Sequence, residues 1–388
     1  MRTIAIVSRS WFPNQQSLFD ALSGLLKPHD LAIRYGVMLG VERGRLWSLG
    51  ESAVSVRPEL IGSGRSIRIL DKEVSSPFGV TAWLENLAPS AVVVTPASEI
   101  GSFVALRTAR RMGVPAIGLT LGVRERQFGW IDGFRLWASK RIHRSFCGRL
   151  DYAFADGTKA ARDVRNLGVL GNDRIIIVRH NIDDRKYWIH SQKERAARSR
   201  RFRQAHNLGD SFCFSYIGQL IRRKGIDLLI RGFGKIASGN PAVKLIIVGR
   251  GPLRGECIHL RATHPGQVLY LDRISDDTIL DFYCASDCVV VPSRFDDWAN
   301  VISESVCSMT SVISSDGAQA AFDLVSPAAV FESGSLSGLI VAMKNAMASH
   351  LEPNAALSKQ EAYARDWSLA ASAEAWKEAL LKVVSSPP

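Results

Sequence analysis

Two carboxylates in the second half of the chain have the residue types and the spacing of a sugar-binding site. Asp296 and Glu304 stand in the segment CVVVPSRFDDWANVISESVC with seven residues between them. The β-branched run at 288–291 predicts a buried strand, and Pro292 predicts a loop that places Asp296 after the strand. Carboxylates accept hydrogen bonds from neighbouring hydroxyls of a sugar or ribose, so the pair suits a nucleotide sugar.

The loop and the helix that follow complete this candidate site. Apolar residues at helical spacing predict a helix with Asn300 as its N-cap and Glu304 on its first turns. Ligands of open α/β sheets bind at the carboxyl ends of strands, and a helix N-terminus adds donors for a phosphate. We include Trp298, which lies between the two carboxylates, in the predicted donor-binding site.

A basic segment upstream supplies a candidate diphosphate site. A strand expected at 212–217 is followed by GQLIRRKG, where Gly218 permits a tight turn and Gln219 comes next. Lys224 enters the following helix, so its ammonium can reach a diphosphate that the helix N-terminus also faces. Arg223, or Arg222 beside it, is expected to add positive charge.

A glycine turn follows the next expected strand, at 244–248. It reads GRGP, which predicts a turn at Gly249 and Gly251. By contrast, the GSG sequence within 61–66 lacks the strand, helix and spacing of a dinucleotide fingerprint, so we interpret it as a turn.

The acidic segment resembles the E-x7-E region of retaining GT-B glycosyltransferases of family 4, the glycogen-synthase and sucrose-synthase-like family. Asp296 stands where the first Glu is usual, and Glu304 matches the second. In the other segment, Lys224 and Gly225 match the family's G-R-L-x-x-x-K-G sequence, and Gln219 replaces its arginine.

Two further positions depart from the family's pattern. The helix that carries the second Glu usually ends in a Gly followed shortly by a Pro, and Met309 and Ser311 stand there.

A segment near the end of the first domain adds to the resemblance. The segment VRHNIDDRKYW resembles the family's closing strand of the first domain, with Asp183 in the acidic position. No histidine of this chain matches the family's N-domain histidine.

The resemblance implies a GT-B fold: two Rossmann-like, doubly wound α/β domains that face a cleft. Alternating strands and helices independently predict parallel sheets. We expect an acceptor-binding domain at 1–190, a basic linker at 191–208 and a donor-binding domain at 209–365. A helix at 366–388 is expected to return to the first domain.

The resemblance also implies the reaction. A hexose would pass with retention from an NDP-sugar to a saccharide or lipid-linked acceptor, in exopolysaccharide, capsule or lipopolysaccharide synthesis. Relatives use no metal and no cofactor beyond the NDP-sugar. Lys224 would hold the leaving diphosphate, Glu304 the ribose and Asp296 the transferred sugar. The turn that contains Gly249 and Gly251 approaches the donor base in a relative, so it would belong to the donor site. Two alternatives stay open: a non-catalytic carbohydrate- or membrane-binding subunit, and a nucleotide-sugar epimerase.

The composition is that of a soluble globular protein with room for two cores. The 388 residues are 46% hydrophobic and have a mean hydropathy of +0.03. No apolar run reaches the roughly 18 residues of a membrane span, and the N-terminus reads as a first strand, so we expect a cytoplasmic protein. The six cysteines show no CxxC pair, and neither a disulfide framework nor a metal site is predicted.

Positive charge is concentrated in the first half of the chain. Residues 1–208 contain 33 Lys and Arg against 18 Asp and Glu, whereas 209–388 contain 16 against 19. Such a half is expected to be drawn to an anionic surface, such as the inner face of a plasma membrane, where the protein would be peripheral. The densest run, 192–209, is interpreted as a solvated boundary helix rather than a nucleic-acid arm, and no nucleic-acid partner is expected.

Two aromatic segments are further candidates. Between 129 and 150, aromatic and basic residues interleave, which fits either a helix at a bilayer interface, with aromatics on one side and cations on the other, or a core helix with a basic face. His143 in it is interpreted as a surface residue. In the loop after the first strand, Trp11 and Phe12 either stack on an acceptor or pack on their own domain.

Overall fold

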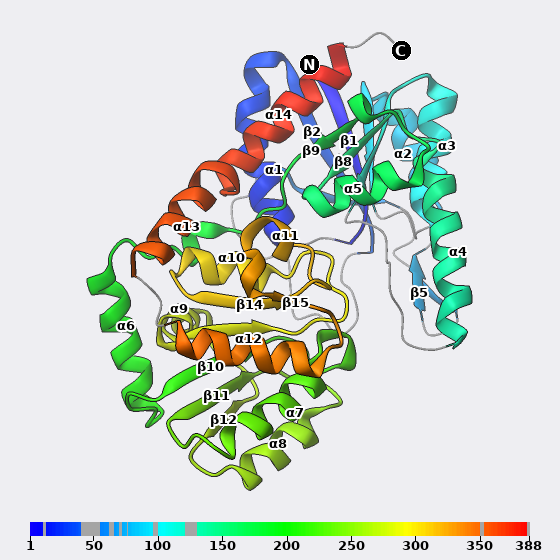
Figure 1. Cartoon of the computed structure of the whole chain (residues 1–388). Coiled ribbons are helices and arrows are strands. Elements are labelled where there is room, and N and C mark those ends of the chain that lie inside the picture. Colours follow the sequence, from blue (N-terminus) through cyan, green and yellow to red (C-terminus); the bar gives the residue numbers. More distant parts are fainter. Residues whose placement is uncertain are drawn as a thin grey trace. The chain divides into compact units, whose positions relative to one another are not determined.

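The computed structural model describes residues 1–10, 13–39, 55–61, 66–69, 72–75, 77–95, 100–120, 130–349 and 353–385. They belong to two compact units, each described by itself. Unit 1 comprises Met1–Ile182 and Trp367–Pro388, and unit 2 comprises Asp183–Asp366 (Figure 1). Each unit has a parallel sheet with helices packed on it, so the predicted α/β class with two Rossmann-like domains is confirmed.

Unit 1 is organised around a seven-stranded parallel sheet in the order β3-β2-β1-β6-β7-β8-β9. Its four-residue strand β6 is buried throughout, because helices cover both faces of such a sheet. A separate antiparallel hairpin joins β4 to β5. The strands of unit 1 are β1 (Arg2–Ser10), β2 (Leu31–Leu39), β3 (Pro58–Leu60), β4 (Ser66–Ile69), β5 (Lys72–Ser75), β6 (Ala91–Val94), β7 (Ala116–Thr120), β8 (Tyr152–Ala155) and β9 (Ile175–Ile177).

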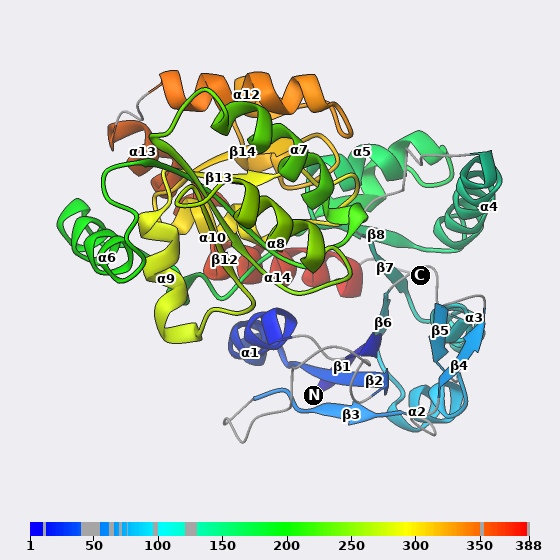
Figure 2. The same cartoon turned by 90° about the horizontal axis from the view of Figure 1, so that it is seen from below.

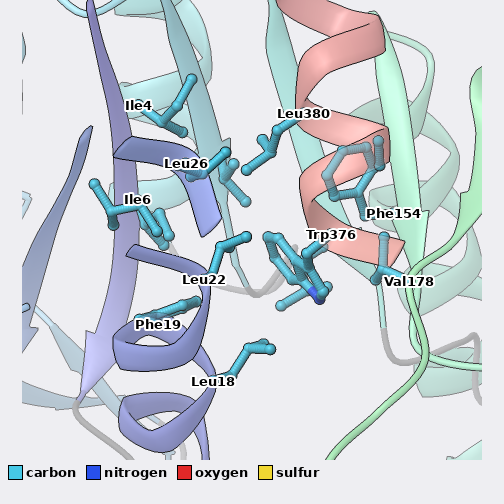
Figure 3. Packing of buried hydrophobic residues seen from close by; sticks show 14 of the residues in the cluster. Ile4, Ile6, Leu18, Phe19, Leu22, Leu26, Phe154, Val178, Trp376 and Leu380 are labelled. Carbon is cyan, nitrogen blue, oxygen red and sulfur yellow. The ribbon is translucent and has the colours of Figure 1, made fainter. Parts of the chain in front are cut away.

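One face of this sheet is covered by the first and the last helix of the chain, α1 and α14. Trp376 of α14 packs edge-on against Phe154 of β8, with ring centroids 5.4 Å apart, and against Phe19 of α1 at 6.2 Å (Figure 3). The opposite face is covered by helices between these two. The helices of unit 1 are α1 (Pro13–Leu26), α2 (Val80–Leu87), α3 (Ile100–Met112), α4 (Trp130–Cys147), α5 (Thr158–Leu167) and α14 (Leu369–Ser385), with 3-10 turns η1 (Lys27–His29) and η2 (Asn172–Arg174).

Unit 2 has a six-stranded parallel sheet in the order β12-β11-β10-β13-β14-β15. The order reverses between β10 and β13, which pair directly at Phe214↔Cys288. Such a reversal opens a crevice at the carboxyl ends of the two strands, which is where ligands of these sheets bind. The strands of unit 2 are β10 (Phe212–Ile217), β11 (Val243–Val248), β12 (Val268–Leu271), β13 (Cys288–Val291), β14 (Ser311–Ser315) and β15 (Val330–Phe331).

Helices pack on both faces of this sheet, with α7, α8 and α12 together on one of them (Figure 2). Their apolar residues meet alternate strand residues, such as Phe214 and Leu245, because successive strand side chains point to opposite faces. The helices of unit 2 are α6 (Gln192–Ala205), α7 (Ile226–Ala237), α8 (Arg254–Thr263), α9 (Asp276–Ala285), α10 (Asn300–Cys307), α11 (Ala321–Leu324), α12 (Leu336–Ala348) and α13 (Pro353–Asp366), with 3-10 turns η3 (Asp184–Lys186), η4 (Arg222–Lys224) and η5 (Pro327–Ala329).

The division between the units differs from the expected boundaries. The chain enters unit 2 at Asp183, so the expected boundary at 190 lies within unit 2. The stretch expected as a basic linker, 191–208, contains helix α6, which packs on α9 as part of unit 2 rather than acting as a linker. Trp367 and the residues after it belong to unit 1.

Because helix α6 belongs to unit 2, the net charge of each unit differs from that of the two halves of the sequence. Unit 1 has 27 Lys and Arg against 17 Asp and Glu, a balance of +10, and unit 2 has 22 against 20, a balance of +2. The basicity of unit 1 therefore remains after the contribution of α6 is assigned to unit 2.

The two described aromatic side chains of helix α4 lie in different environments. Phe146 is buried against Phe103 of α3, with ring centroids 5.2 Å apart. Trp137 is 54% exposed, and the guanidinium of Arg141 lies 5.2 Å from its ring centre. One aromatic thus anchors the helix to the core, and another lies among the arginines. Within the described part of the chain, no helix is long and apolar enough to cross a membrane.

Candidate functional site

Two loops leave neighbouring strands at the point where the sheet of unit 2 reverses. The loop after β10 leads through η4 into α7, and the loop after β13 carries Asp296. They approach each other closely at Gly225, where a Cβ would come within 1.8 Å of the carbonyl oxygen of Pro292. Gly225 also has a φ of +73°, so both the contact and the backbone conformation require glycine.

The predicted glycines form a second close contact at the ends of β10 and β11. A Cβ on Gly249 would lie 1.9 Å from the carbonyl oxygen of Gly218, and one on Gly251 would lie 2.6 Å from that of Leu220. The two turns are joined by a hydrogen bond from the Leu220 amide to the Arg250 carbonyl, 2.8 Å long. These glycines therefore fix the shape of the loop that leads to Lys224.

Lys224 and Asp296 are brought together, although 72 residues separate them in the sequence. The Nζ of Lys224 donates to Oδ2 of Asp296, and both side chains are largely covered, at 22% and 12% exposure. The cation expected to bind the diphosphate thus contacts the carboxylate expected to bind the sugar, at the carboxyl ends of the strands.

The backbone of Asp296 is held by the segment after β14. Its amide donates to Gly317 at 2.9 Å, and its carbonyl accepts from the Gln319 amide at 3.2 Å. Gly317 is needed there because a Cβ would come within 2.3 Å of the Ser293 carbonyl oxygen. The carboxylate is therefore presented by a backbone that is bonded on both sides.

Arg223 joins the two loops through hydrogen bonds. Its Nη1 donates to the Phe295 carbonyl at 2.9 Å, and its own carbonyl accepts from the Arg294 amide at 2.8 Å. Arg294, which the sequence did not single out, binds Asp227 with two bonds of 2.7 and 2.8 Å. Asp227 was recognisable in the sequence as an acidic residue in the first turn of the helix after Lys224. Its pairing with Arg294 could be seen only in the folded structure.

Glu304 has different neighbours from the Lys224–Asp296 pair. The Tyr283 hydroxyl donates to its Oε2, and Tyr187 forms a second hydrogen bond with the carboxyl group. Burial raises the pKa of Glu304 above its ordinary value, and the two tyrosine hydrogen bonds oppose this rise. Both tyrosines were missed in the sequence because they come from η3's C-terminal end and α9, and neither belongs to a motif.

Trp298 and the start of α10 differ from expectation. Trp298 is 3% exposed, and its Nε1 donates to Ser303 at 3.1 Å, so its ring is part of the core beneath the loop. The residue before the helix is Ala299 with a φ of +71°, and Asn300 is the first helical residue rather than the N-cap. No side-chain hydrogen bond caps this helix.

Met309 occupies a backbone conformation that favours glycine. Its φ is +54°, and its side chain is buried with Ile189, Leu280 and Cys284. The packing of a large apolar side chain offsets the unfavourable backbone conformation. Ser311 begins β14 directly afterwards. The buried packing of Met309 thus accommodates a residue other than glycine at this position.

The remaining predicted residues have simple environments. The Gln219 side chain is exposed, and its carbonyl accepts from the Tyr216 hydroxyl at 2.7 Å. Trp11 and Phe12 lie outside the described residues. In the described ranges, no group of three or more His, Cys, Asp or Glu has the arrangement of a metal site.

Comparisons with known proteins assign the second unit. Residues 198–373 match the family model described as Glycosyl transferases group 1, a range that contains β10 to β15 and both loops of the site. This segment is a glycosyl transferases group 1 domain. A stretch of 102 residues is also 33% identical to an uncharacterized glycosyltransferase of Methanocaldococcus jannaschii. That match spans a quarter of each chain.

Some solved structures resemble nearly the whole chain and not only the segment that matches the family model. The Anabaena protein HepE, solved in complex with UDP, has a TM-score of 0.72 at 15% identity, covering 98% of this chain and 100% of that one. A lipopolysaccharide outer core galactosyltransferase, WaaB, has a TM-score of 0.68 at 12% identity, covering 98% and 99%. At these identities the likeness shows the fold, which is GT-B.

Proposed function

We propose that this chain is a retaining glycosyltransferase that moves a hexose from a nucleotide-sugar donor to a saccharide or lipid-linked acceptor. The observation that carries the proposal is the pairing of Lys224 with Asp296 at the strand ends of a group 1 domain. Polysaccharide, capsule or lipopolysaccharide synthesis is the proposed setting, and the likeness to WaaB supports it.

The donor would bind in unit 2, with its diphosphate at Lys224. A lysine ammonium has three donors, so it can keep one bond to Asp296 while it binds a phosphate oxygen. Asp296 would then accept from hydroxyls of the transferred sugar, and Glu304 would accept from the ribose. The complex of HepE with UDP-glucose supports a uridine nucleotide as the first class to test.

In the proposed reaction the bond from the anomeric carbon to the diphosphate oxygen breaks, and a bond to an acceptor hydroxyl oxygen forms. The nucleoside diphosphate leaves, and the proton of the acceptor hydroxyl passes to the oxygen of the departing diphosphate. Lys224 would stabilise the charge that develops on the diphosphate, because a fixed positive group at that point acts on the transition state. Arg223 would hold the Lys224 loop against the Asp296 loop, and we propose that no metal is required.

The first experiment measures donor binding. Calorimetry with UDP-, GDP- and ADP-sugars is performed on the wild type and on the Lys224→Ala and Glu304→Ala variants. We expect one nucleotide class to bind, and each variant to weaken binding by roughly 10- to 100-fold, the range for losing a charge-assisted hydrogen bond. Lys235→Ala, an exposed lysine later in α7, is the matched control and should bind as the wild type does.

The bound donor is then tested for transfer to saccharide and lipid-linked acceptors. NMR of the product should show the anomeric configuration of the donor, and chelation with EDTA should leave the rate unchanged. Donor binding without transfer to any acceptor would favour a non-catalytic subunit. Conversion of the donor without an acceptor would favour an epimerase.

A further inference from the structure

A second candidate binding site lies in unit 1, in a hollow of about 590 Å³ formed by α3, α4 and the turns after α4 and α5. Four arginines line it: Arg110 from the last turn of α3, Arg141 and Arg144 from α4, and Arg149 from the turn that follows. We call it the arginine pocket. The other lining residues are Ser145, Gly148 and Val169, and none is acidic.

The arginines of this pocket differ from other arginines of unit 1 in their partners. Arg111, next to Arg110 in the sequence, forms an ion pair with Glu85, and Arg34 forms one with Glu59. Among the described residues, none of the four pocket arginines forms an ion pair. Arg149 donates to the backbone and hydroxyl oxygens of Ser145, and Arg141 stacks on Trp137.

Four like charges around one hollow repel each other, so an anion that enters it is bound favourably. The guanidinium group offers donors in a planar fork that matches phosphate oxygens. A helix C-terminus favours a single nearby cation, which accounts for Arg110 and Arg144 separately. It does not account for four arginines converging on a space large enough for a phosphate group.

The surface beside the pocket bears on which kind of phosphate it would bind. Trp137 lies one turn before Arg141 on the same side of α4 and is 54% exposed, and Ile142 is 46% exposed. Large apolar side chains next to unpaired cations are typical of segments that enter the headgroup region of a bilayer. A pocket for a free metabolite would not need them.

We propose that the arginine pocket binds the phosphate of an anionic phospholipid headgroup, with Trp137 and Ile142 entering the membrane interface beside it. The site would hold unit 1 on an anionic membrane surface. It is separate from the Lys224–Asp296 site and does not depend on the transfer reaction.

The test is sedimentation of the full-length protein with vesicles of phosphatidylglycerol and phosphatidylcholine at low salt, compared with phosphatidylcholine alone. We expect binding to the anionic vesicles alone. Arg141→Ala/Arg144→Ala should weaken it by roughly 25-fold, since each basic residue near such a surface contributes a factor of about five. Trp137→Ser should also weaken it, although it removes no charge.

The matched control removes two other arginines from unit 1. Arg57 and Arg174 are exposed and do not line the pocket, so Arg57→Ala/Arg174→Ala has the same net charge as the pocket variant. Compared at about 0.15 M salt, where the Debye length is roughly 8 Å, it should bind vesicles within about twofold of the wild type, because charges farther than this from the bound surface are screened. Thermal unfolding checks that each variant is folded.

Three results would overturn the proposal. The first is an equal loss of vesicle binding in both double variants, which would indicate a diffuse charge effect. The second is the absence of vesicle binding by the wild type. The third is stabilisation by inorganic phosphate that the pocket variant loses, without vesicle binding, which would assign the pocket to a soluble phosphate. Nucleotide-sugar binding, measured on the same variants, stays unchanged in each case and so tests the transferase proposal separately.

Discussion

Helices α4 and α6 are both rich in arginine, yet their arginines have different partners. In α6, Arg198 and Arg201 both bind Asp281 of α9, at 3.1 and 2.7 Å, and Arg203 binds Asp287 at 2.7 Å. In α4, Arg141 and Arg144 form no ion pair within the described part of the chain. A count of charges along the sequence made 192–209 the more conspicuous segment. The structure shows that its arginines pair with carboxylates within unit 2, and we propose the less dense segment, α4, as the surface for a partner.

We expect the largest change in the free energy of unfolding from substitution of Arg203 in α6. Arg203 donates to the carbonyls of Gly209, Ser211 and Ala285 as well as to Asp287. Arg203→Ala leaves these acceptors without their donor and should lower the free energy of unfolding by about 3 kcal/mol. Urea denaturation followed by circular dichroism measures it. A loss no greater than that of Arg200→Ala, an exposed arginine of the same helix, would contradict this role.

Substitution of Asp281 in α9 should lower the free energy of unfolding somewhat less. Asp281 is buried, but its partners Arg198 and Arg201 are 28% and 65% exposed, so solvent screens part of the interaction. We expect Asp281→Ala to lower the free energy of unfolding by about 2 kcal/mol. Asp210→Ala, at an exposed position of unit 2, is the control and should change little. Equal values for the two variants would show that α6 is not held by these pairs.

Glu304 extends the comparison to a carboxylate that is held by tyrosines rather than by a cation. Burial raises its pKa in the folded state, so its contribution to stability is present below the ordinary value of 4.5 and is lost as the pH rises through the raised value. Glu304→Gln removes the titrating group. The variant should therefore gain stability relative to the wild type between pH 4 and pH 7.

Urea denaturation at a series of pH values measures this difference. Glu256→Gln, an exposed position on α8, is the control and should follow the wild type at each pH. A Glu304→Gln difference that stays constant, or that changes in the opposite direction, would show that the carboxyl is not held in a raised-pKa environment.

The smallest effect is expected in the arginine pocket. Arg144→Ala removes one of four like charges that have no carboxylate partner among the described residues, so stability should change by no more than about 0.5 kcal/mol, and in the stabilising direction at low salt. The same urea measurement at low and high salt checks it. A loss comparable with that of Arg203→Ala would mean that the pocket arginine has a structural partner and would remove the contrast between the two helices.

Much of unit 2 could be predicted from local patterns. The apolar run at 288–291 and the breaker Pro292 predicted β13 and its loop, and the glycines of GRGP predicted a tight turn, because each property depends on residues close in sequence. The end of α10 could not be predicted in this way. Met309 adopts a left-handed conformation that its own type disfavours, and the buried cluster around it supplies the compensating contacts.

The candidate site shows the same limit. Lys224 and Asp296 were selected separately from motifs, and the fold brings them into an ion pair. Trp298 was selected for its position in the loop, but its ring is buried and bonded to Ser303. Arg294, Tyr187 and Tyr283 were not selected, because their roles depend on partners that no local pattern reveals.

The sequence by itself determined the α/β class, the two sheets and the positions of the glycines, since alternation, periodicity and turn chemistry act over a few residues. Tertiary structure alone decided which charges are neutralised. Arg198 meets Asp281 across 83 residues, and Arg203 meets Asp287 across 84. An ion pair depends on distances of a few ångströms between side chains, and such distances are set when α6 packs on α9, not by the order of residues along the chain.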